Sequence, residues 1–394
     1  MLRPASRLAS LAVVGLLAAC SSSQVAVPVA SPSPPSSITL AVTPLPTSAP
    51  ATPAPTPPSA PPAATPGPTA APAPTPIAVR PGELWLVYQY WDQTAHLRLV
   101  RPDGTGMHLL LPDESREQWH PDWSPDGKRI AFEMDGGIWV AGADGSDLHR
   151  IASCVAPCRD LNQPAWSPDG SEVAFTRIDL VDGQNPGSVV QAVDVATGTI
   201  RDLLRTQGAE YANGARWSPD GRSIVVQLDR LLDPGNDTSR VTGTAIAVVD
   251  LNAKAPKPRR LTDWAMFAAY PDWSPTQDLI VFSTYDLGER DGGSFEDPSP
   301  PSDLYTIRPD GTGVTQLTHN RSGTQLTRNG TASGPLSSQP TWSPDGRSIV
   351  FVQTVGTQWP GWTMATINAD GTGLTAAAGA SFPKGTHPRL RPTP

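Results

Sequence analysis

Short runs of β-branched and aromatic residues recur along the chain after residue 80, and each run follows a polar motif that begins with tryptophan. The five motifs begin at Trp123, Trp166, Trp217, Trp273 and Trp342. The matching apolar runs are Ile130–Phe132, Val173–Phe175, Ile224–Val226, Ile280–Phe282 and Ile349–Phe351. Runs this short, rich in β-branched residues and bounded by turn residues, predict β-strands.

The motif itself predicts a tight turn. Four copies read Trp-Ser-Pro-Asp-Gly, whereas the copy at Trp273 has Thr276 and Gln277 in place of Asp-Gly. Proline presets φ, aspartate supports the turn and glycine accepts positive φ, so the tryptophan strand folds back onto the next strand. A second Asp-Gly pair, as in Asp103-Gly104 and Asp144-Gly145, predicts another hairpin. Each unit therefore has four antiparallel strands, a to d, with tight a–b and c–d turns.

Four-stranded repeats of this kind are typical of β-propeller blades. Successive motif tryptophans are 43, 51, 56 and 69 residues apart, and their regular position predicts packing between blades. The segment before Trp123 has only strands b, c and d. The sequence 387–390, His-Pro-Arg-Leu, parallels 120–123, His-Pro-Asp-Trp, and supplies the missing strand a. The prediction is an all-β, six-bladed β-propeller over residues 81–394, closed by both ends of the chain.

The units resemble the WD-repeat-like blades of the TolB propeller. The shared features are Trp-Ser-Pro-Asp-Gly, an Ile-Ala-Phe-like strand, an Asp-Gly turn and a Leu-Thr ending, here Leu261-Thr262 and Leu317-Thr318. The resemblance covers about residues 82–394 and implies an extracytoplasmic partner of envelope proteins. We see no room for the separate N-terminal α/β domain of TolB, and this departure from the family leaves a role in a Tol system open.

The first 80 residues predict an export signal and a tether. Arg3 and Arg7 precede an apolar run, 8–19, that is too short to span a bilayer. The run ends in Leu-Ala-Ala-Cys20, which resembles a bacterial lipobox and implies a signal peptide at 1–19 with acylation of Cys20; the alternative is an ordinary secretory signal. Residues 20–80 form a Pro/Ala/Ser/Thr-rich tract that predicts a disordered tether. The expected location is therefore extracytoplasmic, with the lipid in the cell membrane or outer membrane as the only membrane contact.

Charge and cysteine content narrow the range of partners. All 37 acidic residues and 27 of the 29 basic residues lie from Arg80 onward, and no basic stripe is present. Nucleic-acid binding needs clustered Lys and Arg, so we expect no nucleic-acid partner. Cys154 and Cys158 are predicted to form a disulfide in an exported protein.

Long insertions occur only in the b–c and d–a connections, which share one face of a propeller. We call this the loop face. It carries acidic residues such as Asp179 and Asp229, which are either solvated loop charges or part of a binding platform. The predicted binding-face aromatics are Trp91, Tyr285, Phe295, Trp359 and Trp362. Exposed aromatic residues beside polar ones are typical of protein, peptide or sugar interfaces.

A second candidate site lies where the inner strands begin. The residues expected at the channel mouth are His120, Gln163, Asn213, Tyr270, Gln339 and His387. They either hydrogen-bond to each other and to water, or they hold a divalent cation through the two imidazoles and Gln163, as similar ring positions do in propeller pectate-type lyases. No calcium loop is present, and the two histidines lack the i, i+4 spacing of a helical metal pair.

No catalytic signature accompanies the repeats. The chain has no Gly-x-Ser-x-Gly elbow, phosphate loop or dinucleotide fingerprint. We therefore expect a non-enzymatic, cofactor-free module of the cell envelope that binds or scaffolds a protein or peptide. The alternative is a carbohydrate-binding protein or a metal-dependent polysaccharide lyase that uses the channel-mouth histidines. The sequence leaves the ligand and the oligomeric state open.

Overall fold

The computed structural model describes residue 80 and residues 82–91, 94–179, 187–232, 240–284, 302–320, 337–354, 362–376 and 385–392. Apart from the 3-10 turn η1 (Trp264–Met266), every regular element in these ranges is a β-strand. The predicted signal peptide, and the predicted tether except Arg80, lie outside the described residues. Among the helices of the described part, none is long and apolar enough to cross a membrane.

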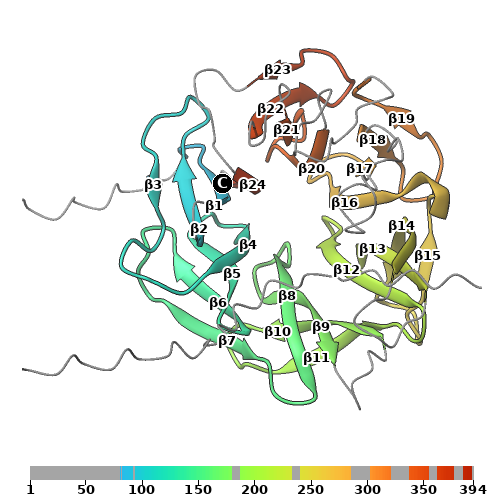
Figure 1. Ribbon diagram of the computed structural model, residues 1–394, viewed down its shortest axis with the longest axis horizontal. Coiled ribbons are helices and arrows are strands. Elements are labelled where there is room, and N and C mark those ends of the chain that lie inside the picture. The colour runs from blue at the N-terminus through green and yellow to red at the C-terminus, as the bar shows by residue number, and fades with distance from the viewer. Residues whose placement is uncertain are drawn as a thin grey trace, which may run out of the picture. The chain divides into compact units, whose positions relative to one another are not determined.

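The strands form six four-stranded antiparallel sheets arranged in a ring, and the strand named first in each blade below lies nearest the centre of the ring (Figure 1). Blade 1 contains β24 (Gly385–Leu390), β1 (Leu86–Trp91), β2 (Ala95–Val100) and β3 (His108–Leu109). Blade 2 contains β4 (Gln118–Trp123), β5 (Arg129–Met134), β6 (Gly137–Gly142) and β7 (His149–Ser153). Blade 3 contains β8 (Cys158–Trp166), β9 (Glu172–Asp179), β10 (Ser188–Asp194) and β11 (Ile200–Arg205).

The remaining blades repeat this order. Blade 4 contains β12 (Glu210–Trp217), β13 (Ser223–Leu232), β14 (Arg240–Asp250) and β15 (Pro258–Arg260). Blade 5 contains β16 (Ala268–Trp273), β17 (Ile280–Thr284), β18 (Leu304–Ile307) and β19 (Thr315–Gln316). Blade 6 contains β20 (Ser337–Trp342), β21 (Ser348–Thr354), β22 (Trp362–Asn368) and β23 (Thr375–Ala376). The predicted six-bladed all-β fold is confirmed.

The ring closes through the C-terminal strand, as the sequence predicts. Strand β24 pairs antiparallel with β1, with Leu390 opposite Leu86 and Arg389 opposite Val87. Blade 1 therefore takes its inner strand from one end of the propeller and its other three strands from the opposite end. This pairing removes the open sheet edge that β1 would otherwise present.

Arg391, just after β24, ties the two ends of the propeller to blade 2. Its backbone N–H donates to Trp85 O at 2.7 Å, and its guanidinium donates to the carbonyl oxygens of Arg80, Glu83 and Gly127. Gly127 has φ 65°, and a Cβ there would lie 2.7 Å from Pro392 O. The glycine of the first motif is therefore needed both for its turn and for the approach of the C-terminus.

The hydrophobic core lies between neighbouring blades. The phenylalanines of the apolar runs are fully buried, namely Phe132, Phe175, Phe282 and Phe351. The motif tryptophans pack beside them, and three donate their indole N–H to the inner strand of an adjacent blade. These bonds run from Trp123 to Arg389 O, from Trp217 to Ala165 O and from Trp342 to Asp272 O, at 3.1–3.2 Å. The tryptophans therefore join blades by packing and by hydrogen bonding.

Each Trp-Ser-Pro-Asp-Gly turn is organised around its serine hydroxyl. Ser124 Oγ donates to Asp126 at 2.6 Å and accepts from the Arg129 N–H at 2.9 Å. The other three complete copies repeat both bonds. In the divergent copy, Gln277 instead donates to Gly346 O in the matching turn of blade 6. The departure from the motif thus forms an inter-blade contact.

We expect removal of residues 386–394 to destabilise the propeller strongly, because it deletes most of β24 and every Arg391 bond. Thermal unfolding followed by circular dichroism should show a fall in Tm of well over 10 °C, or failure to fold. Removal of only 393–394 serves as the control and should leave Tm unchanged. An unchanged Tm after the longer deletion would refute closure by β24.

Candidate functional site

A β-bulge interrupts every inner strand at the same place. At each bulge the inner strand has one residue more than its partner between two paired positions. The bulge residues are His120, Gln163, Gly214, Tyr270, Gln339 and His387, all with φ between 47° and 60°. Positive φ costs a non-glycine residue roughly 1–2 kcal/mol. Five such residues in one ring are a strong sign of a constrained, functional region.

Side chains from the preceding blade hold the bulges in place. Four bulge backbone N–H groups each donate to a side-chain oxygen: His120 to Gln89, Gln163 to Glu133, Tyr270 to Gln227 and His387 to Gln339. Gln89, Glu133 and Gln227 lie on the second strand of the preceding blade, whereas Gln339 is itself a bulge residue. These bonds satisfy amides that the bulges remove from the strand ladders.

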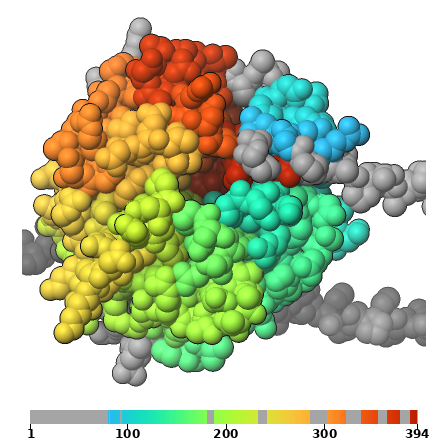
Figure 2. Space-filling view, turned by 180° about the vertical axis from the view of Figure 1, so that it is seen from behind, coloured from blue at the N-terminus to red at the C-terminus, as the bar shows by residue number. Residues whose placement is uncertain are grey.

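The bulge side chains meet around a small cavity in the channel, at the centre of the ring seen in Figure 2. The cavity has a volume of about 20 Å³, which is room for about one water molecule. The His120 and His387 rings are 4.2 Å apart and nearly perpendicular, and Tyr270 lies 5.9 Å from His387. His120 Nδ1 is 2.7 Å from Glu133 Oε1. Five of the six predicted channel-mouth residues therefore lie together here.

His387 is held in its neutral form. Burial lowers its pKa well below the ordinary value of 6.5, and the nearby His120, Arg389 and Arg216 act in the same direction. Its Nδ1 atom is buried and has no hydrogen-bond partner among the described residues. No group of three or more His, Cys, Asp or Glu in the described ranges is placed to hold a metal ion.

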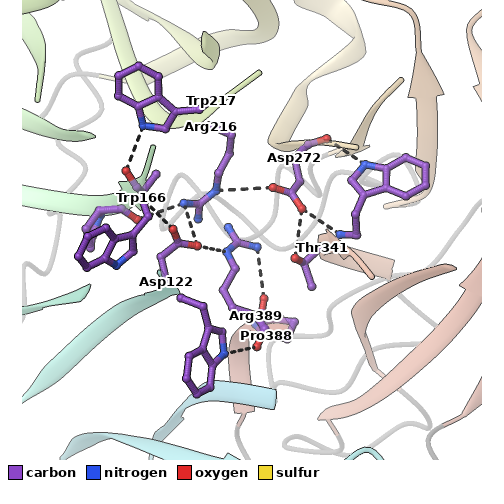
Figure 3. Close-up of polar contacts among 12 residues, drawn as sticks. Asp122, Trp166, Arg216, Trp217, Asp272, Thr341, Pro388 and Arg389 are labelled. Atoms are coloured by element: carbon purple, nitrogen blue, oxygen red, sulfur yellow. Dashed lines mark hydrogen bonds and ion pairs between the residues drawn. The ribbon is translucent and has the colours of Figure 1, made fainter. Parts of the chain in front are cut away.

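Two residues further along the inner strands lie four charged side chains that are each 12–15% exposed, and we call them the floor because Arg216 and Arg389 line the cavity (Figure 3). Arg216 lies 3.6 Å from Asp122 and 3.9 Å from Asp272, and Arg389 lies 3.4 Å from Asp122. The two carboxylates also accept from backbone N–H groups of the next blade, Asp122 from Trp166 at 2.8 Å and Asp272 from Trp342 at 2.9 Å. The floor thus pairs two arginines with two aspartates, and together these contacts connect all six blades.

Burial is the dominant effect on these charges. Desolvation raises the pKa of Asp122 and lowers the pKa of Arg389 to about 10, although the ion pairs act in the opposite direction. A buried pair of this kind is costly to break, because the remaining partner keeps an uncompensated charge.

A larger cavity opens beside the channel over blades 3 and 4, and we call it the blade-4 recess. Its volume is about 410 Å³, within the usual range for ligand pockets. Its lining includes Asn162, Gln163, Thr176, Ile178, Tyr211, Asn213, Gln227, Asp229, Leu231 and Tyr270. Asn213 lies here, one residue before the bulge, and donates to Asp229 at 2.8 Å. The structure has Gly214 at the channel position where the sequence reading placed Asn213.

A second cavity of about 610 Å³ lies on the loop face between blades 2 and 3, with Arg116, Trp119, Glu133 and Asp160 in its lining. Trp119 lies 5.2 Å from Trp91, and Trp91 is 38% exposed. Of the other predicted aromatics, Tyr285, Phe295 and Trp359 lie outside the described residues, and Trp362 begins β22. Trp91 and Trp119 therefore form an aromatic pair at the edge of a recess.

Cys154 and Cys158 are joined by a disulfide in the connection from blade 2 to blade 3. The opposite face also has a cavity, of about 430 Å³, between the a–b turns of blades 3 and 4. In its lining Arg201 donates twice to Glu172, and Asp169 and Asp220 accept from hydroxyl and backbone N–H groups of their own turns. The blade-4 recess differs because Asn162 Oδ1, Gln163 Oε1 and Thr176 Oγ1 in its lining have no hydrogen-bond partner among the described residues.

The charged floor and the residues that hold the bulges are not among the sites predicted from the sequence. A signal for the floor exists, because all four of its residues directly precede the motif tryptophan or its equivalent, Leu390. The bulge-holding residues carried a weaker signal, a single polar side chain on an apolar strand, as with Gln227 in β13.

No family model matches the chain. A curated protein, the uncharacterized peptidase YuxL of Bacillus subtilis strain 168, is 29% identical over 164 residues. That match covers 37% of this chain and 22% of the peptidase, so the chain spans about a fifth of the length of this relative.

Among solved structures, TolB from Acinetobacter baumannii is similar, with a TM-score of 0.53 and 17% identity over 78% of this chain and 66% of that chain. A putative TolB from Agrobacterium tumefaciens has a TM-score of 0.51 and 19% identity over 75% of this chain and 89% of that chain. At these identities the likeness concerns the fold. The chain has the β-propeller fold of the TolB structures, as its motifs imply.

We expect the Arg216→Met variant to lose about 3–5 kcal/mol of unfolding free energy, because it leaves the buried Asp272 without its cation. Urea denaturation measures the loss. The double variant Arg216→Met/Asp272→Leu should recover part of it. The control is Arg201→Met, which breaks a surface pair and should cost less than about 1 kcal/mol. Equal losses for Arg216→Met and Arg201→Met would contradict a stabilising floor.

His387 should make stability depend on pH. The unfolded chain takes up a proton on this histidine below about pH 6.5, whereas the folded protein keeps it neutral. Its contribution is therefore present at neutral pH and is lost as the pH falls through and below 6.5. Urea midpoints should decline more between pH 7 and pH 5 in the wild type than in His387→Asn, since asparagine tolerates positive φ. The exposed His149→Asn control should keep the wild-type slope.

Proposed function

We propose that the chain is an extracytoplasmic, lipid-anchored β-propeller that binds a protein or peptide of the cell envelope on its loop face and catalyses no reaction. The observation that carries the proposal is a line of features across this face. It runs from the Trp91–Trp119 pair through the recess between blades 2 and 3 to the blade-4 recess. An extended chain suits such a line better than a compact ligand does, because the features span blades 1 to 4.

Sequence features support the location. The apolar run before Cys20 and the proline-rich tract after it suit export, acylation and a standoff from the membrane. The likeness of the fold to TolB structures is compatible with an envelope role and leaves the partner open.

The aromatic pair also favours a second candidate, a carbohydrate-binding protein. Exposed indole rings provide apolar faces with a polar edge, which suit glycans as well as peptides. A lyase version of this candidate would require a divalent cation near His120 and His387. A glycan array, with metal analysis of the purified protein, separates this candidate from peptide binding.

We expect the Trp91→Ala/Trp119→Ala variant to lose its partner from envelope extracts. The bait is the full chain with Cys20→Ser, which prevents acylation, and retained proteins are quantified by mass spectrometry. A specific partner should fall at least tenfold with the variant. The control Ile200→Ala/Leu374→Ala removes two exposed apolar residues from the opposite face and should retain the partner. No specific partner, or equal retention by the tryptophan variant, would argue against the proposal.

A further inference from the structure

We propose that the blade-4 recess binds the primary carboxamide of a glutamine or asparagine side chain in the peptide ligand. The inference rests on the proposed peptide-binding function and names the chemical group that this part of the loop face recognises. The shared chemistry is a neutral amide group at the end of an aliphatic chain, which either residue provides.

The recess lies where one blade lacks a long polar side chain. In each blade, one residue of the second strand pairs with the inner-strand residue that precedes the bulge. In blades 1, 2 and 4 this residue is Gln89, Glu133 or Gln227, and its side chain accepts from the bulge N–H of the next blade. In blade 3 it is Thr176, which pairs with Asn162 and lines the recess. Threonine is shorter than glutamine or glutamate, so space beside it stays open.

Three polar atoms in the lining have hydrogen-bonding capacity that the described residues do not use. Asn162 Oδ1, Gln163 Oε1 and Thr176 Oγ1 are buried and have no hydrogen-bond partner among those residues. Because Asn162 and Thr176 are directly paired across β8 and β9, their side chains lie close together on one face of the blade. Thr176 is only 1% exposed. Buried polar atoms normally have a partner, so this group of atoms indicates a polar ligand.

The three atoms define what the ligand must offer. Asn162 Nδ2 donates to Asp160 at 3.3 Å, which leaves Asn162 Oδ1 as an acceptor for a ligand. Gln163 Oε1 is a second acceptor, and the Thr176 hydroxyl can donate or accept. A carboxylate has no donor for the two acceptors, and a hydroxyl group has one. A primary carboxamide has two N–H donors for the amide oxygens and a carbonyl oxygen for the threonine hydroxyl.

Blade 4 provides an internal example of a carboxamide in the corresponding position. Gln227 Oε1 accepts from the Tyr270 N–H at 3.1 Å, and Gln227 Nε2 donates to Asp229 at 2.8 Å. The residue is 3% exposed, so its amide is satisfied by the protein itself. A ligand carboxamide beside Thr176 would provide in blade 3 the group that Gln227 provides in blade 4.

The test compares three probes of similar size that differ in hydrogen-bond donors. Butyramide, methyl butyrate and sodium butyrate are titrated separately into the full chain carrying Cys20→Ser. Ile178 and Leu231 line the recess as apolar walls for the methylene groups, so their methyl NMR signals report occupancy. We expect saturable shifts with butyramide and at least tenfold weaker binding of the other two probes, which have no N–H donor. Equal binding of all three probes, or no saturable shift with butyramide, would overturn the inference.

Variants test the assigned position. Thr176→Gln supplies the long side chain that blades 1 and 4 carry, and it should abolish butyramide binding because its own carboxamide fills the site. Thr176→Val keeps the side-chain shape, removes the hydroxyl and should weaken binding about threefold. The control Thr306→Val makes the same change at a residue on β18 that is 3% exposed and does not line the recess, and it should have no effect.

The two Thr176 variants give independent results. Unchanged butyramide binding by a folded Thr176→Gln protein would overturn the inference. If Thr176→Gln fails to fold, an affinity of Thr176→Val equal to that of the wild type would do the same.

Peptide variants identify the residue that enters the recess and separate this inference from the proposed function. Peptides from the captured partner are compared with versions in which glutamine is replaced by methionine or asparagine by leucine. Loss of binding with one replacement identifies the side chain. If neither replacement weakens binding, the carboxamide inference is wrong while peptide binding stands. If butyramide binds as expected but no envelope protein or peptide does, the proposed function fails and the carboxamide site stands.

Discussion

The pairing of β24 with β1 is the interaction on which the other features depend. It closes the ring, so no blade is left with an exposed inner edge. The same strand brings His387 into the channel and Arg389 into the floor, and Arg391 follows directly. The channel and its floor are therefore complete only when both ends of the propeller meet.

Two positions on the inner strands have distinct tasks. The bulge position supplies a polar side chain to the channel in five blades, and the position before the motif tryptophan or its equivalent supplies the floor charges in four. Arg216 of blade 4 reaches Asp122 of blade 2 past the small Ala165 of blade 3, and it donates to Pro164 O on the way. Arg216 therefore joins carboxylates from two other blades, Asp122 and Asp272.

The repeat made the blades predictable, because the turn motif and the apolar run recur with fixed chemistry. Most of the channel ring was predictable for a similar reason, since a proline follows the bulge residue in five blades. Blade 4 has Ala215 there, so the marker is missing and the sequence points to Asn213 instead of Gly214. The floor depends on contacts between blades that are distant in sequence, such as Arg389 with Asp122, and local patterns do not report such pairs. Most of the predicted loop aromatics lie outside the described residues.

Gly214 has a consequence for how a repeat protein can change its ligand. Gly214 lines the channel cavity where the other five blades present a side chain, so the ring is more open in this one sector. Side-chain acceptors surround the ring, because four of the bulge amides donate to a side chain of the preceding blade. Exchange of a glycine and a large residue between two bulge positions would move the opening to another sector of the ring. Related propellers could therefore diverge in specificity through single substitutions while their scaffold stays the same.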